Sequence, residues 1–285
     1  MRLGFGLGLQ YSRLSGGGGN TDAFIIEVDT TKAGTPSDQF QFTGAEGDYD
    51  VVAKQNGVVI ETFDNLSNEA TITFASSGIY VLEVIPKDTN GFNRIAFDNG
   101  GDKDKMLDIK QWGTIVWSSF DSAFNRCENM LVTATDVPNF IEVTITNRMF
   151  RFCYNANPDV SNWDMSNVNN MERMFQQAES ATPNVSQWNT SSLVNMDDMF
   201  ENAEIANPNC RDWDVSNVTQ ASQAFNLCNI STENLTAIYE NWSQQTLQNN
   251  VTFGAGNARF FESGQASKDI LVNTYNWTIT DGGQI

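Results

Sequence analysis

The segment PDVSNWDMSNVNNMERMFQQA at residues 158–178 returns as PNVSQWNTSSLVNMDDMFENA at 183–203 and as PNCRDWDVSNVTQASQAFNLC at 208–228. The copies start at a constant interval, at Pro158, Pro183 and Pro208, with tryptophan and phenylalanine at fixed places within each. A fixed period of about 25 residues is typical of repeat proteins, because one unit cannot bury its apolar face alone. We therefore expect a solenoid of stacked turns with one continuous core.

The same register extends toward the N-terminus. Phe150 precedes Phe175 by the same interval, and Phe124 precedes Phe150 by nearly the same interval. Pro138 stands where the later turns carry tryptophan, which marks that turn as irregular. Between residues 107 and 228 the register accommodates about five turns.

Two elements are expected within a turn. Residues 160–164 are short and flanked by proline and asparagine, which predicts a strand, and stacked strands lie about 4.8 Å apart. Apolar residues in 168–178 follow three- and four-residue steps, which indicates a helical face, although 168–171 also suits a brief strand. Stacking then aligns two aromatic ladders: Trp163, Trp188 and Trp213, and Phe150, Phe175, Phe200 and Phe225.

The phrases DVSNWDMSNVNNMERMF at 159–175 and DWDVSNVTQASQAF at 212–225 resemble the 25-residue repeats of BspA-like surface proteins, the DUF285 group. The resemblance runs from about Phe92 to the C-terminus and includes WTITDGG at 277–283. It implies a solenoid of the leucine-rich-repeat class. It also implies a place among bacterial surface proteins or phage virion proteins, and it says more about architecture than about activity.

Acidic residues dominate the composition. The chain has 16 Lys and Arg against 35 Asp and Glu, which gives a net charge of −19. The basic residues look scattered along the chain, so we expect no nucleic-acid partner and no docking to an anionic membrane. No apolar run is long enough to cross a bilayer, so we expect no membrane insertion.

The four cysteines share repeat positions with small apolar residues. Cys127, Cys153 and Cys228 occupy a position that is alanine in the other turns, and Cys210 occupies a valine position. We interpret all four as reduced core residues. Cys127 and Cys153 alone lie on adjacent turns, close enough for a disulfide in principle.

Residues 1–20 are predicted to be an anchor peptide followed by a glycine linker. The apolar residues alternate with Arg2 and glycines: Leu3, Phe5, Leu7 and Leu9. This period suits an extended strand that adds to the edge of a partner's sheet, and the start is similar to short Gly-Leu-rich starts of phage virion proteins. A disordered tail is the alternative. The start carries no convincing cleavage site and is interpreted as mature sequence.

Residues 21–90 predict a small β-sandwich. Six short alternating segments lie at 24–28, 40–42, 49–55, 58–63, 70–74 and 79–85. Asn56-Gly57 between two of them is a strong hairpin signal. The stretch SGIYVLEVI at 77–85 resembles the last strands of PKD-like and other immunoglobulin-like modules.

Two further regions flank the repeats. Residues 91–228 form the expected repeat region, which opens with a strand at 92–97 and an acidic loop at 98–105. The loop is interpreted as a solvated turn, because the spacing of a calcium-binding EF-hand is missing. Residues 229–285 are expected to cap the solenoid with a helix opened by Ser231 and Thr232, a strand at 251–253, a second helix at 266–275 and a last strand at 277–280.

The residue types do not assemble a catalytic motif. The chain contains no histidine, the commonest general base and metal ligand. Asp164, Asn189 and Asp214 recur at one repeat position, which turn hydrogen bonds explain better than a paired-carboxylate site. We therefore predict no catalytic, cofactor-binding or metal-binding residue and no enzyme; a carbohydrate-active enzyme is the third hypothesis, which needs a cleft with two carboxylates.

These observations together predict a non-enzymatic phage virion protein, namely a tail fibre, receptor-binding or capsid decoration protein. Its N-terminal segment would bind other virion subunits or its own copies in a homo-oligomer. Its solenoid would bind a glycan or protein of the host surface. The alternative is a bacterial BspA-like adhesin, located on the cell surface rather than in the virion, which a signal peptide or sorting tail would favour.

Overall fold

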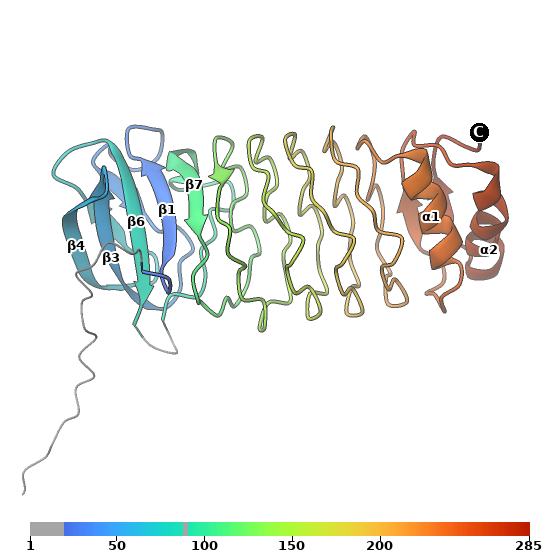
Figure 1. Cartoon of the computed structure of the whole chain (residues 1–285), viewed down its shortest axis with the longest axis horizontal. Coiled ribbons are helices and arrows are strands. Elements are labelled where there is room, and N and C mark those ends of the chain that lie inside the picture. The colour runs from blue at the N-terminus through green and yellow to red at the C-terminus, as the bar shows by residue number, and fades with distance from the viewer. Residues whose placement is uncertain (1–19, 88–90) are drawn as a thin grey trace, which may run out of the picture.

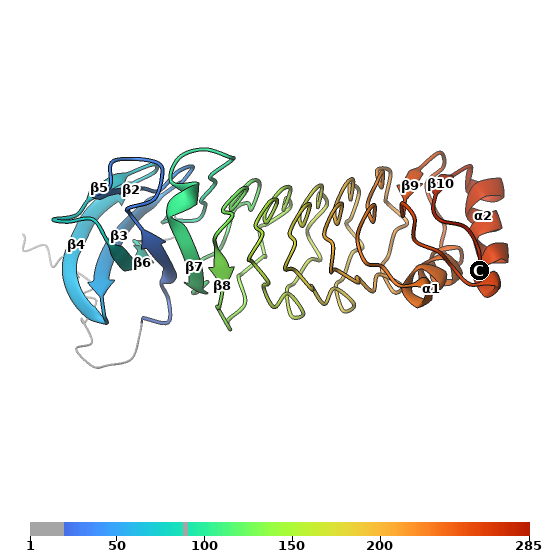
Figure 2. The same cartoon turned by 90° about the horizontal axis from the view of Figure 1, so that it is seen from above.

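The computed structural model describes residues 20–87 and 91–285. The molecule is elongated, with a β-sheet at one end, a stack of turns in the middle and two helices at the other end (Figure 1). One hydrophobic core runs along the whole length, from Phe24 to Trp277. The view from above shows the same order, with the sheet and the helices at opposite ends of the stack (Figure 2).

The N-terminal strands follow the predicted alternation. They are β1 (Phe24–Asp29), β2 (Gln39–Gln41), β3 (Asp48–Gln55), β4 (Val58–Ser67), β5 (Thr71–Thr73) and β6 (Ile79–Pro86). The predicted hairpin joins β3 to β4, and its turn residues Asn56 and Gly57 both have positive φ, at 50° and 78°. Asparagine and glycine tolerate this conformation best, so local residues determine this turn.

The sheet does not end with these strands. The strand β7 (Met106–Gln111) pairs antiparallel with β1, and β8 (Leu131–Val132) pairs parallel with β7. The result is one mixed, open sheet in the order β4-β3-β6-β1-β7-β8, beside a two-stranded sheet of β2 and β5. Residues from the expected repeat region thus complete the N-terminal sheet.

The predicted fold class, an immunoglobulin-like sandwich followed by a leucine-rich-repeat solenoid, is therefore wrong. The described residues form neither a closed sheet nor a solenoidal sheet, and the core is built on the mixed sheet. Pairing between β1 and β7 joins residues far apart in the chain, which an alternating pattern cannot reveal. The strand expected at 92–97 is also wrong, since Gly91 and Arg94 make only single bridges.

The repeats form turns that are joined by single parallel bridges. The bridges are Ile145 to Asn170, Asn170 to Asn195, and Asn195 to Gln220. The strand expected at 160–164 and the helix expected at 168–178 do not form. Tight turns on both sides limit the extended backbone, because Val168 donates to the carbonyl of Met165 and Arg173 has a φ of 56°.

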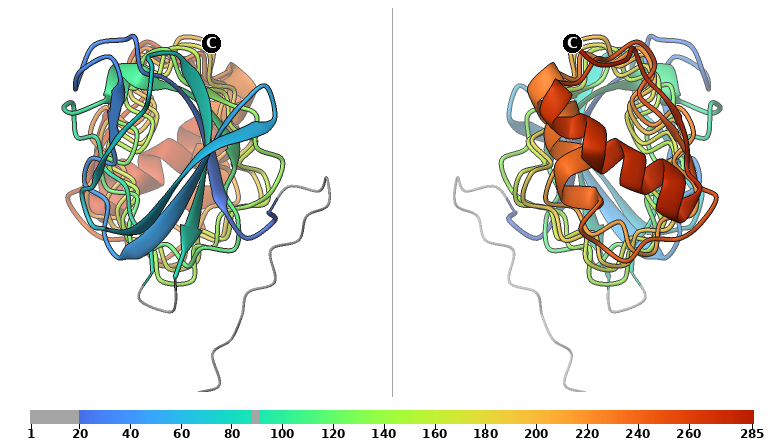
Figure 3. Two further views of the ribbon diagram at one scale, coloured as in Figure 1. Left: turned by 90° about the vertical axis from the view of Figure 1, so that its left-hand side faces the viewer. Right: turned by 90° about the vertical axis from the view of Figure 1, so that its right-hand side faces the viewer.

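Backbone hydrogen bonds nevertheless hold each turn to the next. Alternate N–H groups donate to the following turn at 2.9 Å, namely Thr146 to Asn170, Arg148 to Glu172, Phe150 to Met174 and Phe152 to Gln176. The same pattern recurs one turn later. The turns therefore superimpose when the molecule is seen along its length (Figure 3).

The acidic loop at 98–105 departs from the predicted solvated turn. Asp102 and Lys105, at the short helix η1 (Lys103–Lys105), have side chains that are 0% exposed, with 3.6 Å between Nζ and the carboxylate. Asp102 accepts hydrogen bonds from the backbone of Thr35 and Gln41, and Lys105 donates to the carbonyl of Pro36. Burial lowers the pKa of Lys105, and Asp102 opposes that shift. We call Asp102 and Lys105 the buried clamp, because their hydrogen bonds hold residues 34–41 against the loop.

The C-terminal elements match the prediction. They are α1 (Thr232–Trp242), β9 (Thr252–Gly254), the short helix η2 (Glu262–Gly264), α2 (Gln265–Tyr275) and β10 (Thr278–Thr280). Ser231 caps α1 by accepting a hydrogen bond from the Asn234 amide at 3.2 Å. A bridge from Ala221 to Phe253 joins this region to the last turn.

All four cysteines are free, as predicted. Cys127, Cys153 and Cys210 are buried and Cys228 is half-buried. Burial raises the pKa of each thiol. In the part of the chain that the structure describes, no helix is both long and apolar enough to cross a membrane.

Candidate recognition surface

Polar turns repeat along the exposed side of the stack. Asp164, Asn189 and Asp214 each accept a hydrogen bond through Oδ1 from the amide two residues later, at 3.0 or 3.1 Å. The turn hydrogen bonds predicted for this row are confirmed. Hydrogen bonds from Ser166 lower the pKa of Asp164, which stays ionised at neutral pH. The row is therefore a fixed, evenly spaced set of polar groups.

A second polar surface carries most of the charge of the repeats. We call it the polar strip and define it as the polar side chains of residues 121–128, 147–154, 172–179, 197–204 and 222–229. Its side chains contact one another from turn to turn. Arg151 Nε donates to Gln176, and Gln176 in turn donates to Glu201, so one chain of hydrogen bonds crosses three turns.

Charge is unevenly distributed along the polar strip: the second turn carries only cations, the fourth only acids, and the fifth no charge. The cations lie in the first three turns: Arg126, Arg148, Arg151 and Arg173. The fourth turn carries only acids: Asp197, Asp198, Glu201 and Glu204. Arg173, in the third turn, makes ion pairs of 2.6 Å to the adjacent Glu172 and 2.9 Å to Asp198 in the fourth turn.

Sequence reasoning missed this grouping of arginines. They come from three separate stretches of the chain and look scattered in the sequence. The 25-residue register was the signal that could have found them, because residues one period apart lie on adjacent turns.

Asp197 lies in the crowded acidic part of the strip. Burial raises its pKa, and the nearby charges of Asp198 and Glu172 add to that shift. The Ser222 amide, 2.6 Å from Oδ1, acts in the opposite direction. The ionised form of Asp197 therefore lowers the stability of the folded state.

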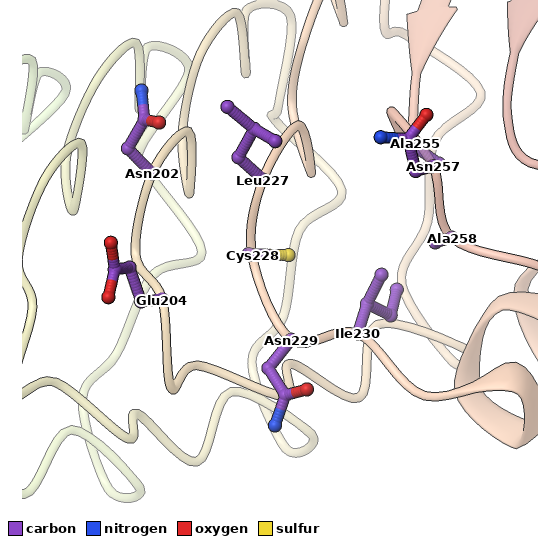
Figure 4. A pocket seen from close by; sticks show the side chains of 9 residues that line it. All are labelled: Asn202, Glu204, Leu227, Cys228, Asn229, Ile230, Ala255, Asn257 and Ala258. Carbon is purple, nitrogen blue, oxygen red and sulfur yellow. The ribbon is translucent and has the colours of Figure 1, made fainter.

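A shallow recess of about 380 Å³ lies where the last turns meet the C-terminal region (Figure 4). Asn202, Glu204 and Asn257 supply amide and carboxylate groups, and Leu227, 54% exposed, supplies an apolar wall. Burial raises the pKa of Cys228 to about 11, and its Sγ lies 3.3 Å from the Phe225 carbonyl. The thiol stays protonated at neutral pH, so the recess offers contact groups and no activated nucleophile.

One family model matches this chain. Residues 118–242 match the family described as "Mycoplasma protein of unknown function, DUF285". The match supports the DUF285, or BspA-like, family. No curated protein and no solved structure matches the chain. The DUF285 region covers the turns of the polar strip and helix α1, and of the N-terminal sheet it includes only strand β8.

The predicted aromatic ladders lie inside the DUF285 region. Ring centroids of Phe150, Phe175, Phe200 and Phe225 follow one another at 5.7 or 5.8 Å with nearly parallel planes. Trp188 and Trp213 stack at 5.9 Å. The ring of Trp163 packs instead against Phe140 at 5.1 Å and Phe150 at 6.1 Å, and among the described residues it does not stack on Trp188.

The remaining predictions concern the N-terminal anchor and metal binding. The anchor residues Leu3, Phe5, Leu7 and Leu9 are outside the described residues. Within 20–87 and 91–285, no three His, Cys, Asp or Glu side chains gather closely enough to hold a metal ion.

Proposed function

We propose that the chain is a non-enzymatic structural protein of a phage virion that presents its DUF285 region to the host surface. The observation that carries this proposal is the polar surface of the stack, where the same turn geometry returns in successive repeats. Groups already fixed in place lose little conformational entropy on binding. A regular row of such groups suits a repeating polymer, such as a surface glycan.

The proposed position in the virion is that of a tail fibre, a receptor-binding protein or a capsid decoration protein. Attachment is assigned to the N-terminal segment on its alternating apolar pattern alone. The sheet adds a second contact surface, because β4 is an open edge strand. Its residues Val58, Val59 and Ile60 are 64%, 53% and 47% exposed. Exposed apolar edge strands are normally covered, so this edge supports contact with another subunit or a second copy.

A bacterial adhesin is the second candidate. It would use the same polar surface and the same DUF285 region, and it differs in where the protein resides. Quantitative mass spectrometry of purified phage particles and of host cell envelopes separates the two. We expect the protein to be enriched in particles. Enrichment in envelopes of uninfected cells would contradict the virion proposal and favour the adhesin.

A further inference from the structure

Phe152 holds two arginines in place on the polar strip. The guanidinium carbons of Arg126 and Arg151 lie 4.0 and 4.4 Å from its ring centroid. Phe152 has a φ of 58°, and the same conformation recurs at Arg126, Gln177, Asn202 and Leu227, so it belongs to the repeated turn geometry that fixes the ring in place. The ring is only 9% exposed, so both arginines are packed against a rigid support.

We call Arg126, Arg148, Arg151 and Arg173 the arginine cluster. Two of its members have N–H donors to spare. Residues 143–158 contain no Asp or Glu. Arg148 Nε is buried and has no hydrogen-bond partner among the described residues. Arg151 Nε donates to the neutral side chain of Gln176. By contrast, Arg126 pairs with Glu128 at 3.7 Å and Arg173 pairs with Asp198.

The cluster is electrostatically unfavourable as it stands. Burial lowers the pKa of Arg151, and the charges of Arg148, Arg173 and Arg126 lower it further. An arginine has five N–H donors in a planar fork that matches an oxyanion. A bound anion would satisfy the spare donors and offset the repulsion between the guanidinium groups.

We propose that Arg148 and Arg151, the latter packed on Phe152, form a binding site for the anionic groups of an acidic polysaccharide. The adjoining acids Glu172, Asp197 and Asp198 would repel a long continuous polyanion such as a nucleic acid. A saccharide that carries a charge only at intervals can place one anion on the arginines and neutral hydroxyls on the acids. The location of this polymer on the host surface rests on the proposed function.

Binding of defined polymers to the purified full-length chain tests this site. Hyaluronate, with a carboxylate on alternate sugars, and a sparsely sulfated dextran present spaced carboxylate and sulfate groups, respectively, and neutral dextran and single-stranded DNA are the comparisons. We expect an acidic polysaccharide to bind, neutral dextran not to bind, and inorganic sulfate to compete. The stronger of the two acidic polymers identifies the preferred anion. Tighter binding of single-stranded DNA, or equal binding of neutral dextran, would overturn the proposal.

A matched pair of variants assigns the binding to the cluster. Arg148→Gln with Arg151→Gln should weaken binding by about tenfold or more, a loss of about 1.4 kcal/mol or more. Arg211→Gln with Arg259→Gln changes the net charge equally at exposed sites outside the strip, and it should leave affinity within about twofold. Equal losses in both variants would refute the site. If the first variant does not fold, sulfate competition on the unaltered protein decides the question, and binding that sulfate does not reduce would refute the site.

This experiment is independent of the location of the protein. It uses no phage particle, so enrichment in cell envelopes would refute the virion proposal and leave the arginine site standing. Conversely, lack of polysaccharide binding would refute the arginine site and leave the assignment to particles untouched.

Discussion

Trp188 shows how a single residue contributes to the stacking of turns. Its side chain is 4% exposed and stacks on Trp213, and its Nε1 donates to the carbonyl of Val160 at 2.8 Å. Trp213 repeats this bond one turn later, to the carbonyl of Val185 at 3.0 Å. Each tryptophan thus fills the core and also satisfies a carbonyl of the preceding turn. Trp163 Nε1 has no such partner among the described residues.

Replacing Trp188 should destabilise the whole stack. We expect Trp188→Ala to lower the free energy of unfolding by about 3–5 kcal/mol, because it leaves a cavity and removes one of the two hydrogen bonds that the Val160 carbonyl accepts. Val194→Ala alters an exposed residue of the same turn, and it should change stability by less than about 0.5 kcal/mol. Urea unfolding followed by tryptophan fluorescence and circular dichroism measures both. Equal unfolding midpoints for the two variants would contradict the stacked packing.

Loss of the negative charge at Asp197 and at Asp164 should change the stability of the folded state in opposite directions. The pKa of Asp197 is raised, so its contribution to stability is present below the unfolded value near 3.8 and is lost as the pH rises through the folded pKa. The pKa of Asp164 is lowered, so its contribution is present above that value and is lost as the pH falls through the folded pKa.

Melting temperatures of Asp197→Asn and Asp164→Asn test this pair. At pH 7 we expect the first substitution to raise the melting temperature and the second to lower it. The difference for Asp197→Asn should shrink as the pH falls through its folded pKa toward 3.8, and the difference for Asp164→Asn should shrink as the pH falls below 3.8. A pH-independent effect, or the same sign for both at pH 7, would show that packing rather than charge controls these positions.

At the scale of elements, turn chemistry outweighs the apolar pattern inside the repeats. The apolar positions in 168–178 have helical spacing, yet positive φ at Arg173 and Gln177 interrupts any helix. Those angles arise from hydrogen bonds to the neighbouring turns, which a single segment does not contain. The hairpin of β3 and β4 and the helix α1 were predictable, because Asn56-Gly57 and the Ser231 cap are local signals.

The buried clamp of Asp102 and Lys105 is another element that the sequence pattern concealed. A run of glycine, aspartate and lysine is typical of a solvated loop, and the actual burial depends on the distant segment 34–41. The charges are satisfied by backbone groups as well as by each other. Such pairs are costly to break, because the remaining charge stays buried.

Removing one charge of this clamp should therefore destabilise the sheet end of the molecule. We expect Asp102→Asn to lower the free energy of unfolding by about 3 kcal/mol or more, since Lys105 would keep a buried charge. Asp98→Asn, on the exposed part of the same loop, should change it by less than about 0.5 kcal/mol. Guanidinium unfolding compares the two. Similar small changes for both variants would contradict the buried pair.

At the scale of the whole molecule, one core joins an N-terminal sheet, a stack of turns and a pair of C-terminal helices. The 25-residue register predicted the phenylalanine ladder and the stacking of Trp188 on Trp213, and it contained enough information to predict the arginine cluster as well. The sheet order was not predictable, because β7 and β8 join it from beyond the N-terminal strands. The recess at Leu227 and Asn257 also depends on how the C-terminal region meets the last turn.

Under the proposed function, this arrangement would separate attachment from recognition along one axis. The open β4 edge lies at the sheet end, and the polar strip lies along the stack. The N-terminal anchor precedes the sheet in the chain, so attachment there would leave the DUF285 region to project outward. That division of roles is the central claim of the proposed function.

Incorporation of an N-terminally truncated protein into phage particles tests this claim most directly. We expect the chain lacking residues 2–15 to fold with an unchanged melting temperature and to fall by about tenfold or more in purified particles, measured by quantitative mass spectrometry. Replacing Gly16, Gly17, Gly18 and Gly19 with serine keeps a flexible linker and should leave incorporation unchanged. Normal incorporation of the folded, truncated chain would contradict the account.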